Sequence, residues 1–316
     1  MHRGRGAGVA AALSSALFLG LSPVFGKLAI NLGFTPLSVV AWRTALAAGL
    51  VLFIFVALFR SYLYIYPVGL LGCALAGLVN GLGSILFYMA LDRLSASIGQ
   101  MLYSLYPFFA AVWLTFDDHH LSLLTILRIG LAIVGVALLT ILPTHPVDLV
   151  GAAMMLGAAA LYALHLPINQ RVLYEVPPPT VTLYTLMAMT AVVVPAALLF
   201  DRQAPIANAV WWPVLALTLM TLLSRLALFF GIKRIGGMQT ALLGLAELLV
   251  TVVFSIWWLH ESLAPAQWLG ALVLSSSLLL VRFERPTGPH QANRHGWFGW
   301  IRPPEVQSSP SWTPDE

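Results

Sequence analysis

Apolar windows of about 20 residues, separated by short stretches of Pro, Gly and charged residues, follow one another along most of the chain. An α-helix rises roughly 1.5 Å per residue, so each window is long enough to cross a hydrocarbon core about 30 Å thick. The connections are short, for example at 144–147 and 233–237, so successive spans are expected to be antiparallel neighbours. We predict about ten spans, near 7–27, 37–59, 67–91, 95–116, 122–142, 148–170, 179–200, 211–232, 238–259 and 264–281.

The composition is that of a membrane protein. Of the 316 residues, 59% are hydrophobic and 9% are charged, and the mean hydropathy is +0.88, whereas a soluble domain carries roughly 25% charged residues. The net charge of +4 does not indicate nucleic-acid binding, because the sixteen Lys and Arg residues are scattered at helix ends. Cys73 is the one cysteine, so neither an intrachain disulfide nor cysteine ligation of a metal is expected. The predicted fold class is all-α and polytopic.

The two halves of the chain resemble each other at a nearly constant offset. Leu91–Leu94 lies 141 residues before the similar Ile232–Ile235, and Pro36 lies 143 residues before Pro179. Five spans per half is an odd number, so the second copy must enter the membrane from the opposite side, which is an architecture typical of transporters. We predict a first five-helix repeat at 1–143, a second, inverted repeat at 144–285 and a disordered cytoplasmic tail at 286–316.

The basic residues outside the spans predict the orientation. One side holds Lys27, Arg93 and Arg202, whereas the other holds eight, which are Arg3, Arg5, Arg60, Arg171, Lys233, Arg234, Arg282 and Arg285. Positive loops favour the cytoplasm, so both termini are predicted to be cytoplasmic and the protein to lie in the cytoplasmic (inner) membrane. The basic start followed by apolar residues 7–21 resembles a signal peptide, but we interpret it as an uncleaved span because the second half contains its counterpart.

A carboxylate halfway along the predicted ninth span is the strongest functional signal. An ionised side chain at mid-membrane costs roughly 2.5–3.5 kcal/mol, so Glu247 is expected to face protein or water. Thr240, Gly244, Glu247 and Thr251 share one helical face by their spacing, and we interpret this face as lining a cavity. Desolvation disfavours the charged form, so Glu247 could exchange a proton or bind an amine. The alternative is a permanent ion pair with Arg225.

Two segments of the second half carry a recognisable pattern. They are 228–247, Leu-Phe-Phe-Gly-Ile-Lys-Arg-Ile-Gly-Gly-Met-Gln-Thr-Ala-Leu-Leu-Gly-Leu-Ala-Glu, and the step His260-Glu261 followed by Leu263, Gln267 and Gly270. On these residues the chain resembles the EamA-type domains of the drug/metabolite transporter superfamily. The resemblance covers roughly residues 8–282 and implies a ten-helix, inverted-repeat carrier that moves small metabolites, often outward.

The chain departs from the family pattern at several positions. Leu248 follows Glu247 where the family often has proline, and the first half has Tyr106 before Pro107 where an acid is usual. The loop 117–120, Asp-Asp-His-His, replaces a Gly-Glu-like step. These departures mean that a substrate is not transferred from relatives. An Arg in the second span, here Arg43, agrees with the family.

Arg225 is expected to share a helical face with Thr218, Thr221 and Phe229. A guanidinium group on this face could hold a substrate carboxylate by two hydrogen bonds. If Arg225 and Glu247 both face the cavity, a zwitterion such as an amino acid would satisfy each of them. The alternative is that Arg225 extends toward the cytoplasmic headgroups.

Other polar side chains form stripes on several spans and are candidates for substrate binding or coupling. They are Tyr162, His165 and Asn169 on the sixth span, Asn80, Ser84 and Tyr88 on the third, Gln100 and Tyr103 on the fourth, Thr221 on the eighth and Gln239 on the ninth. The alternative for these groups is interhelical hydrogen bonding. Arg43, about 9 Å inside the outer end of the second span, is a candidate gate or external anchor, or else contacts headgroups. Spans 1, 3, 4, 6, 8 and 9 are expected to line the cavity.

The consecutive residues Asp117, Asp118, His119 and His120 resemble a metal site, but neighbouring side chains on a helix point apart, so we interpret them as a solvated cytoplasmic loop. Nucleophile, phosphate-loop and Walker motifs are absent from the sequence. We therefore predict neither a cofactor nor a metal, and neither enzymatic activity nor ATP-driven pumping.

The sequence favours a secondary transporter that exports a small polar metabolite, of the amino acid or amine class, by alternating access with optional proton coupling. Its predicted partners are the small-molecule substrate and membrane lipid, and nucleic acid is not expected to bind. The sequence does not decide whether the protein forms a homodimer. The alternatives are a membrane-embedded enzyme acting on a lipid or polyprenyl substrate and a non-transporting receptor or scaffold.

Overall fold

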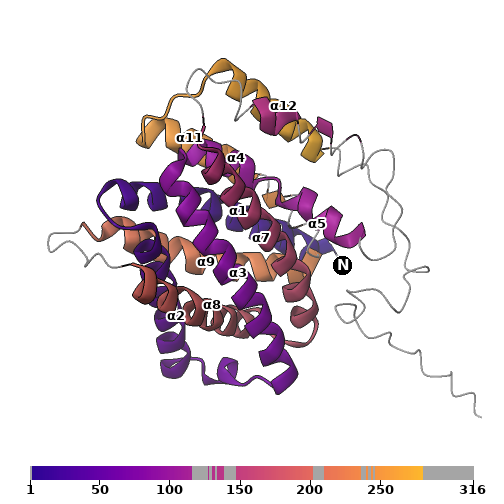
Figure 1. The fold of residues 1–316 in the computed structure, drawn as a ribbon. Coiled ribbons are helices and arrows are strands. Elements are labelled where there is room, and N and C mark those ends of the chain that lie inside the picture. The colour runs from indigo at the N-terminus through magenta and orange to yellow at the C-terminus, as the bar shows by residue number, and fades with distance from the viewer. Residues whose placement is uncertain are drawn as a thin grey trace, which may run out of the picture.

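The computed structural model describes residues 2–115, 127, 130–131, 134–138, 147–201, 210–235, 240, 243–244 and 246–279. Throughout these ranges the regular elements are helices (Figure 1). In chain order they are α1 (His2–Asn31), α2 (Pro36–Ala57), the short 3₁₀ helix η1 (Arg60–Leu63), α3 (Pro67–Arg93), α4 (Ala96–Tyr103), α5 (Tyr106–Thr115), α7 (Leu149–Glu175), α8 (Pro178–Phe200), α9 (Trp212–Ile235), α11 (Ala246–Trp258) and α12 (Pro265–Leu279).

Membrane-spanning length is reached by six helices in the described ranges. They are the segment Gly6–Asn31 of α1 together with α2, α3, α7, α8 and α9, and α11 is a shorter apolar helix. The prediction of a helical membrane protein is confirmed, whereas the number of ten spans stays a prediction. Most of the predicted fifth span and the whole tail 286–316 lie outside the described residues.

The predicted span at 95–116 is not one continuous helix, because this segment forms two helices, α4 and α5. Pro107, the second residue of α5, has no N–H to donate to the carbonyl of Tyr103, and its ring disfavours a helical backbone just before it. The N–H of Leu105 instead bonds the carbonyl of Leu102 at 3.2 Å, which tightens the chain between the two helices. The helix is therefore interrupted near the middle of the expected span.

Side chains at the helix starts explain several boundaries. The hydroxyl of Thr35 accepts the N–H of Ser38 before α2, and the hydroxyl of Ser95 accepts the N–H of Ile98 before α4. The carboxylate of Asp148 accepts the first free N–H groups of α7. Each cap satisfies backbone donors that have no intrahelical partner. Proline in the first turn of α2, α3 and α8 needs no such partner, so it suits these positions.

The first helix of the first half packs along the third helix of the second half. Near the start of α1, Gly8 lies against Ile235 at the end of α9. Further along, the hydroxyl of Ser15 donates to the carbonyl of Ser224 at 3.1 Å. The residue numbers rise on one helix while they fall on the other, so α1 and α9 are antiparallel.

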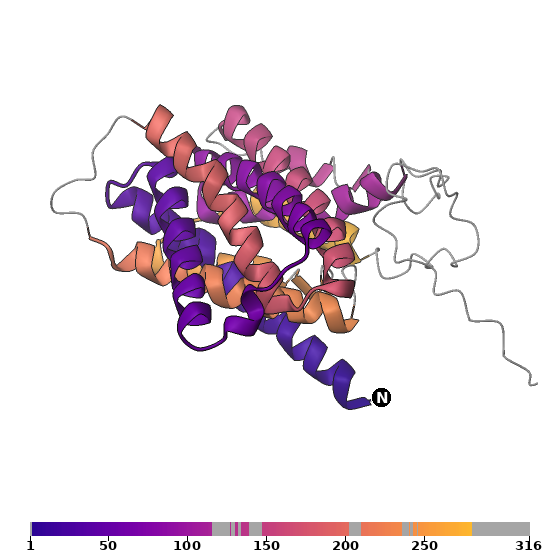
Figure 2. The same ribbon diagram turned by 90° about the horizontal axis from the view of Figure 1, so that it is seen from below.

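The reciprocal pair, α3 of the first half and α7 of the second, packs in the same way. Gly72 lies against Val172 early in α3, and Gly83 lies against Leu161 later, so this pair is also antiparallel. The second helices of the two halves, α2 and α8, also contact each other, and α4 contacts α11. Figure 2 shows α1 extending beyond this bundle at its N-terminal end. The two halves therefore interlock through matching helices.

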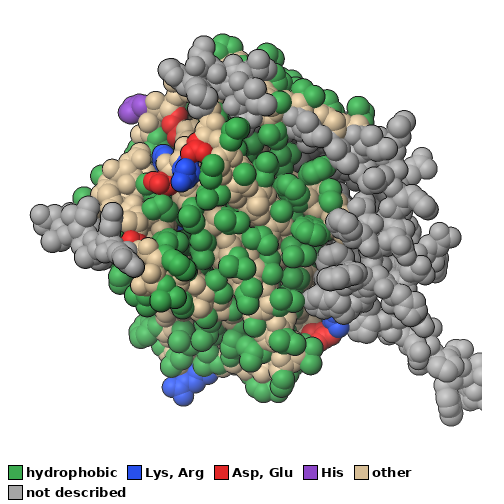
Figure 3. Space-filling model, in the orientation of Figure 1, with side chains coloured by type: hydrophobic (Ala, Val, Ile, Leu, Met, Phe, Trp, Pro, Cys, Tyr) green, Lys and Arg blue, Asp and Glu red, His purple; other side chains and the backbone are tan. Residues whose placement is uncertain are grey.

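The surface of the bundle is largely apolar. Phe53, Leu71 and Leu198 are 70%, 71% and 78% exposed, which is unusual for a protein in water. Figure 3 shows hydrophobic side chains over the middle of one face, with charged side chains gathered toward its ends. This distribution suits contact with lipid around the bundle and with water at both ends.

Candidate functional site

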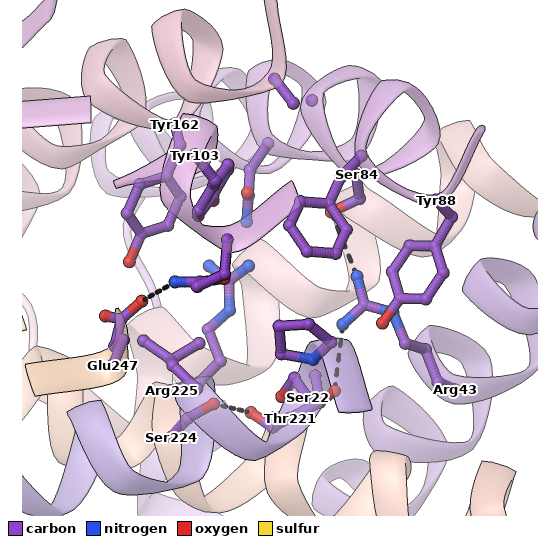
Figure 4. A pocket seen from close by; sticks show the side chains of 17 residues that line it. Ser22, Arg43, Ser84, Tyr88, Tyr103, Tyr162, Thr221, Ser224, Arg225 and Glu247 are labelled. Carbon is purple, nitrogen blue, oxygen red and sulfur yellow. Dashed lines mark hydrogen bonds between the residues drawn. The ribbon is translucent and has the colours of Figure 1, made fainter. Parts of the chain in front are cut away.

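A polar pocket lies inside the bundle and is lined by seventeen residues from both halves (Figure 4). The lining comes from α1, α3, α4, α7, α9 and α11, the helices that correspond to the expected cavity-lining spans, and also from α2 through Arg43. The cavity volume is about 60 Å³, which leaves room for a few water-sized molecules. A metabolite of several heavy atoms therefore needs the helices to move apart.

Glu247 reaches this pocket from α11, and its side chain is buried. The amide of Gln100 donates to its Oε2 at 3.4 Å. One turn later, the hydroxyl of Thr251 donates to the carbonyl of Gly20 on α1 at 2.6 Å, which holds α11 against α1. A Cβ at Gly244 would collide with the hydroxyl of Tyr106, so only glycine fits beside the carboxylate there. The four residues predicted to share a face, Thr240, Gly244, Glu247 and Thr251, are all buried, but among them Glu247 alone lines the pocket.

Arg225 is held by neutral groups. Its Nη1 lies 3.3 Å from His165 Nε2, and its Nη2 lies 3.4 Å from Met189 Sδ. The side-chain amide of Asn80 is oriented with its oxygen toward the Arg225 guanidinium, because this orientation pairs donor with acceptor. The oxygen then accepts a hydrogen bond from Nη1 at 2.6 Å and another from Nη2. The ion pairs within the described residues are Arg93–Asp148 and Arg171–Glu175. The alternative of a permanent Arg225–Glu247 pair, and that of contact between Arg225 and the headgroups, are therefore not what the structure shows.

Arg43 also points inward, so the expected alternative of headgroup contact is wrong. Its side chain is 8% exposed, and its two terminal nitrogens donate to Thr221 at 3.1 Å and to Ser84 at 3.2 Å. The guanidinium carbon lies 4.7 Å from the centre of the Tyr88 ring, a cation–π distance. The third guanidinium nitrogen, Nε, is buried without a partner. Packing against α3 and α9 thus turns this cation toward the pocket.

Two predicted site residues on α7 lie outside the pocket lining. His165 is fully buried, and its Nδ1 lies 2.9 Å from the carbonyl of Tyr162, which favours a proton on Nδ1 and leaves Nε2 to accept from Arg225. Asn169 donates to the carbonyl of His165 at 2.9 Å, one turn back on the same helix. These groups support Arg225 and the helix near Pro167, where the ring removes one backbone donor.

The other predicted site residues divide simply. Those that line the pocket are Asn80, Ser84, Tyr88, Gln100, Tyr103, Tyr162 and Thr221. Gln239 lies outside the described residues, as does the loop 117–120. Within the described ranges, groups of three or more His, Cys, Asp or Glu side chains suited to a metal are not found. Whether the lining residues contact a substrate stays a prediction.

Sequence reasoning missed several lining residues, notably Ser22 and Pro23 on α1 and Ser224 on α9. Pro23 lies inside α1 and lacks the N–H that would bond the carbonyl of Leu19, another lining residue. A proline in mid-span was a readable signal, because such a residue leaves a backbone carbonyl that suits a polar cavity. Ser224 offered no signal beyond its position next to Arg225.

Two of the tyrosines that line the pocket, Tyr103 and Tyr162, pack against each other and against further aromatic rings. The Tyr103 and Tyr162 rings have centroids 5.3 Å apart, and those of Tyr106 and Tyr162 are 5.0 Å apart and nearly perpendicular. Phe87 packs edge-on against Tyr103 at 5.0 Å. Edge-to-face packing of this kind stabilises a fixed arrangement of rings. Figure 4 shows Tyr103 and Tyr162 beside Glu247 and Arg225.

Comparisons with known proteins agree with this architecture. Residues 6–141 and 149–283 each match the EamA-like transporter family. The uncharacterized transporter sll1319 of Synechocystis sp. (strain ATCC 27184 / PCC 6803 / Kazusa) is 27% identical over 228 residues, which are 68% of this chain and 66%, just under two thirds, of that protein. A protein of known crystal structure has a similar fold, with a TM-score of 0.61 over 89% of this chain and 100% of its own, at 16% identity.

The family match covers most of the chain in two consecutive segments, and it confirms the resemblance seen in the sequence. The chain belongs to the EamA-like transporter family.

Proposed function

We propose that this protein is a secondary transporter that exports a small polar metabolite of the amino acid class across the cytoplasmic membrane by alternating access. The observation that carries the proposal is the buried pocket shared by both halves, in which Arg43, Arg225 and Glu247 face one space. An amine alone is a poorer fit, because two guanidinium groups would repel a cation. Membership of a transporter family favours this function over the enzyme and receptor alternatives.

The architecture that we propose has ten spans in two inverted repeats, at 1–143 and 144–285, with both termini in the cytoplasm. Its support is the reciprocal antiparallel packing of α1 with α9 and of α3 with α7. If α1 and α3 run in one direction, α7 and α9 run in the other. A substrate site between two such repeats can open alternately to each side when the repeats rock against each other.

Interruptions in the helices around the pocket support such movement. Pro23 lies inside α1, Pro167 lies inside α7, and α4 is separated from α5 before Pro107. Each interruption removes a backbone hydrogen bond, so bending there disturbs fewer intrahelical contacts. Because the cavity volume leaves room for only a few water-sized molecules, we assign this arrangement to a closed state of the cycle.

Glu247 is the proposed proton-coupling group. Its carboxylate is buried, its hydrogen-bond donor Gln100 is neutral, and neither ion pair of the described chain involves it. Burial disfavours a charged carboxylate and water stabilises it, so opening the pocket to either side changes the tendency of Glu247 to hold a proton. Proton uptake on one side and release on the other would then drive the solute.

Transport by reconstituted protein tests the proposal. We expect counterflow of at least one small polar solute in proteoliposomes, and gradient-driven accumulation that a Glu247→Gln variant loses. A Glu175→Gln variant is the matched control, because Glu175 lies at the end of α7 and binds Arg171 and Tyr66 outside the pocket. Transport of no solute above empty liposomes would refute the function. Full gradient-driven transport by Glu247→Gln would remove Glu247 from the mechanism.

A further inference from the structure

The charged residues that line the pocket are two cations and one acid: Arg43, Arg225 and Glu247. Arginine stays protonated in proteins, so both guanidinium groups carry a charge. The pocket therefore has a net charge of about +1 when Glu247 is ionised and about +2 when it is protonated. In either state its charge is positive.

Neutral groups surround both cations. The donors of Arg225 meet the amide oxygen of Asn80, the imidazole of His165 and the sulfur of Met189. Such dipoles orient a guanidinium but do not cancel its charge, and in a low-dielectric interior an uncancelled charge is unfavourable. Arg225 is thus set up to receive an anion rather than occupied by one of the protein's own.

Arg43 is likewise a buried cation whose partners are neutral. Its two terminal nitrogens donate to the hydroxyls of Thr221 and Ser84, whereas its Nε is buried without a partner. Thr221 lies one turn before Arg225 on α9, so the two guanidinium groups approach the same part of that helix. Figure 4 shows both side chains extending into the pocket that they line. Their mutual repulsion is relieved when a negative group lies near both.

We infer that the pocket selects a small organic anion with a net negative charge, held through a carboxylate by Arg43 and Arg225. This inference rests on the proposed function and narrows its substrate class, from amino acids in general to acidic amino acids and related small carboxylic acids. A neutral zwitterion leaves the pocket charge unbalanced, and a cation adds to it. An ammonium group on an acidic amino acid can still meet Glu247, which lines the same pocket.

Pairs of solutes that have nearly the same shape and differ by one charge test the inference. The probes are glutamate against glutamine and aspartate against asparagine, in which the amide is net neutral, with putrescine as the cationic member. In counterflow with the full-length protein, we expect the acid of each pair to compete at a concentration at least about tenfold lower than its amide, because the net-neutral amide leaves the positive charge of the two guanidinium groups unbalanced.

Two variants connect this selectivity to the named residues. Arg225→Gln and Arg43→Gln should each reduce the acid-to-amide preference, whereas Arg171→Gln should leave it unchanged because Arg171 pairs with Glu175 outside the pocket. The preference of the unmodified protein is measured first, so the test does not depend on either variant folding. Equal or stronger transport of an amide or of putrescine would overturn the inference and leave transport itself standing. If the protein transported neither the probes nor any other solute, both the inference and the proposed function would be overturned.

Discussion

Glu261 links the two halves at one end of the bundle, and its removal makes a sharp test of the fold. Its Oε1 accepts the N–H of Ala96 at 2.6 Å, and its Oε2 accepts the N–H and the hydroxyl of Ser97 at 2.9 and 2.7 Å. These backbone groups begin α4 in the first half, whereas Glu261 follows α11 in the second. A carboxylate at a helix N-terminus satisfies free donors and opposes the helix dipole.

The magnitude follows from these three bonds. A hydrogen bond to a charged group contributes about 1.5–3 kcal/mol, and loss of a helix N-cap costs about 0.5–2 kcal/mol. The bonds share one carboxylate, and the Glu261 side chain is partly exposed, so water replaces some of them. We expect Glu261→Ala to lower the free energy of unfolding by about 2–3 kcal/mol, and Glu261→Gln, which keeps one acceptor oxygen, by about 1 kcal/mol.

Thermal unfolding of the purified protein in detergent measures the effect. A loss of 2–3 kcal/mol should lower Tm by roughly 3–5 °C for a chain of 316 residues. Glu175→Ala is the control, because the exposed Glu175 accepts from the Tyr66 hydroxyl and from Arg171 but caps no helix. An exposed pair of this kind contributes about 0–1 kcal/mol. If Glu261→Ala lowers Tm no more than Glu175→Ala, the carboxylate does not stabilise the junction between the halves.

Three further changes test other parts of the structure. The Arg93 guanidinium holds the pKa of Asp148 below its usual value. The ionised Asp148 should therefore stabilise the folded protein above about pH 4, and this stabilisation should be lost as the pH falls through the lower folded pKa. The Asp148→Asn variant should lack this loss when unfolding is measured as a function of pH. Gly77→Ala should lower stability by about 1–3 kcal/mol in thermal unfolding, because its Cβ would lie 2.5 Å from a side chain and 2.6 Å from a backbone carbonyl of α8. Gly49→Ala is the control and should not lower stability, because there is open space around Gly49. Equal losses in the two variants would contradict close packing of α3 on α8. His260 has a left-handed backbone with φ of 54°, so His260→Gly should raise stability by about 1 kcal/mol, and a lower Tm would contradict strain at this position.

Several features followed from the sequence because they depend on local properties. Apolar length predicted membrane spans, and the spacing of Gly244, Glu247 and Thr251 predicted their common inward face. Burial of an acid in lipid is so unfavourable that its direction could be inferred without neighbours. Pro107 was visible in the sequence, but its effect on the predicted fourth span was underestimated.

The partners of Arg225 and the direction of Arg43 were decided by tertiary structure alone. Both Arg225 and Glu247 line the pocket, but the ion pair considered between them from the sequence is not what the structure shows. The spacing of Thr218, Thr221, Arg225 and Phe229 predicted that they share one face of α9, and all four are buried, but spacing does not identify the helices that this face contacts. Packing of α9 against α1 and α2 instead places Arg225 beside Asn80 and His165, and turns Arg43 inward to Thr221.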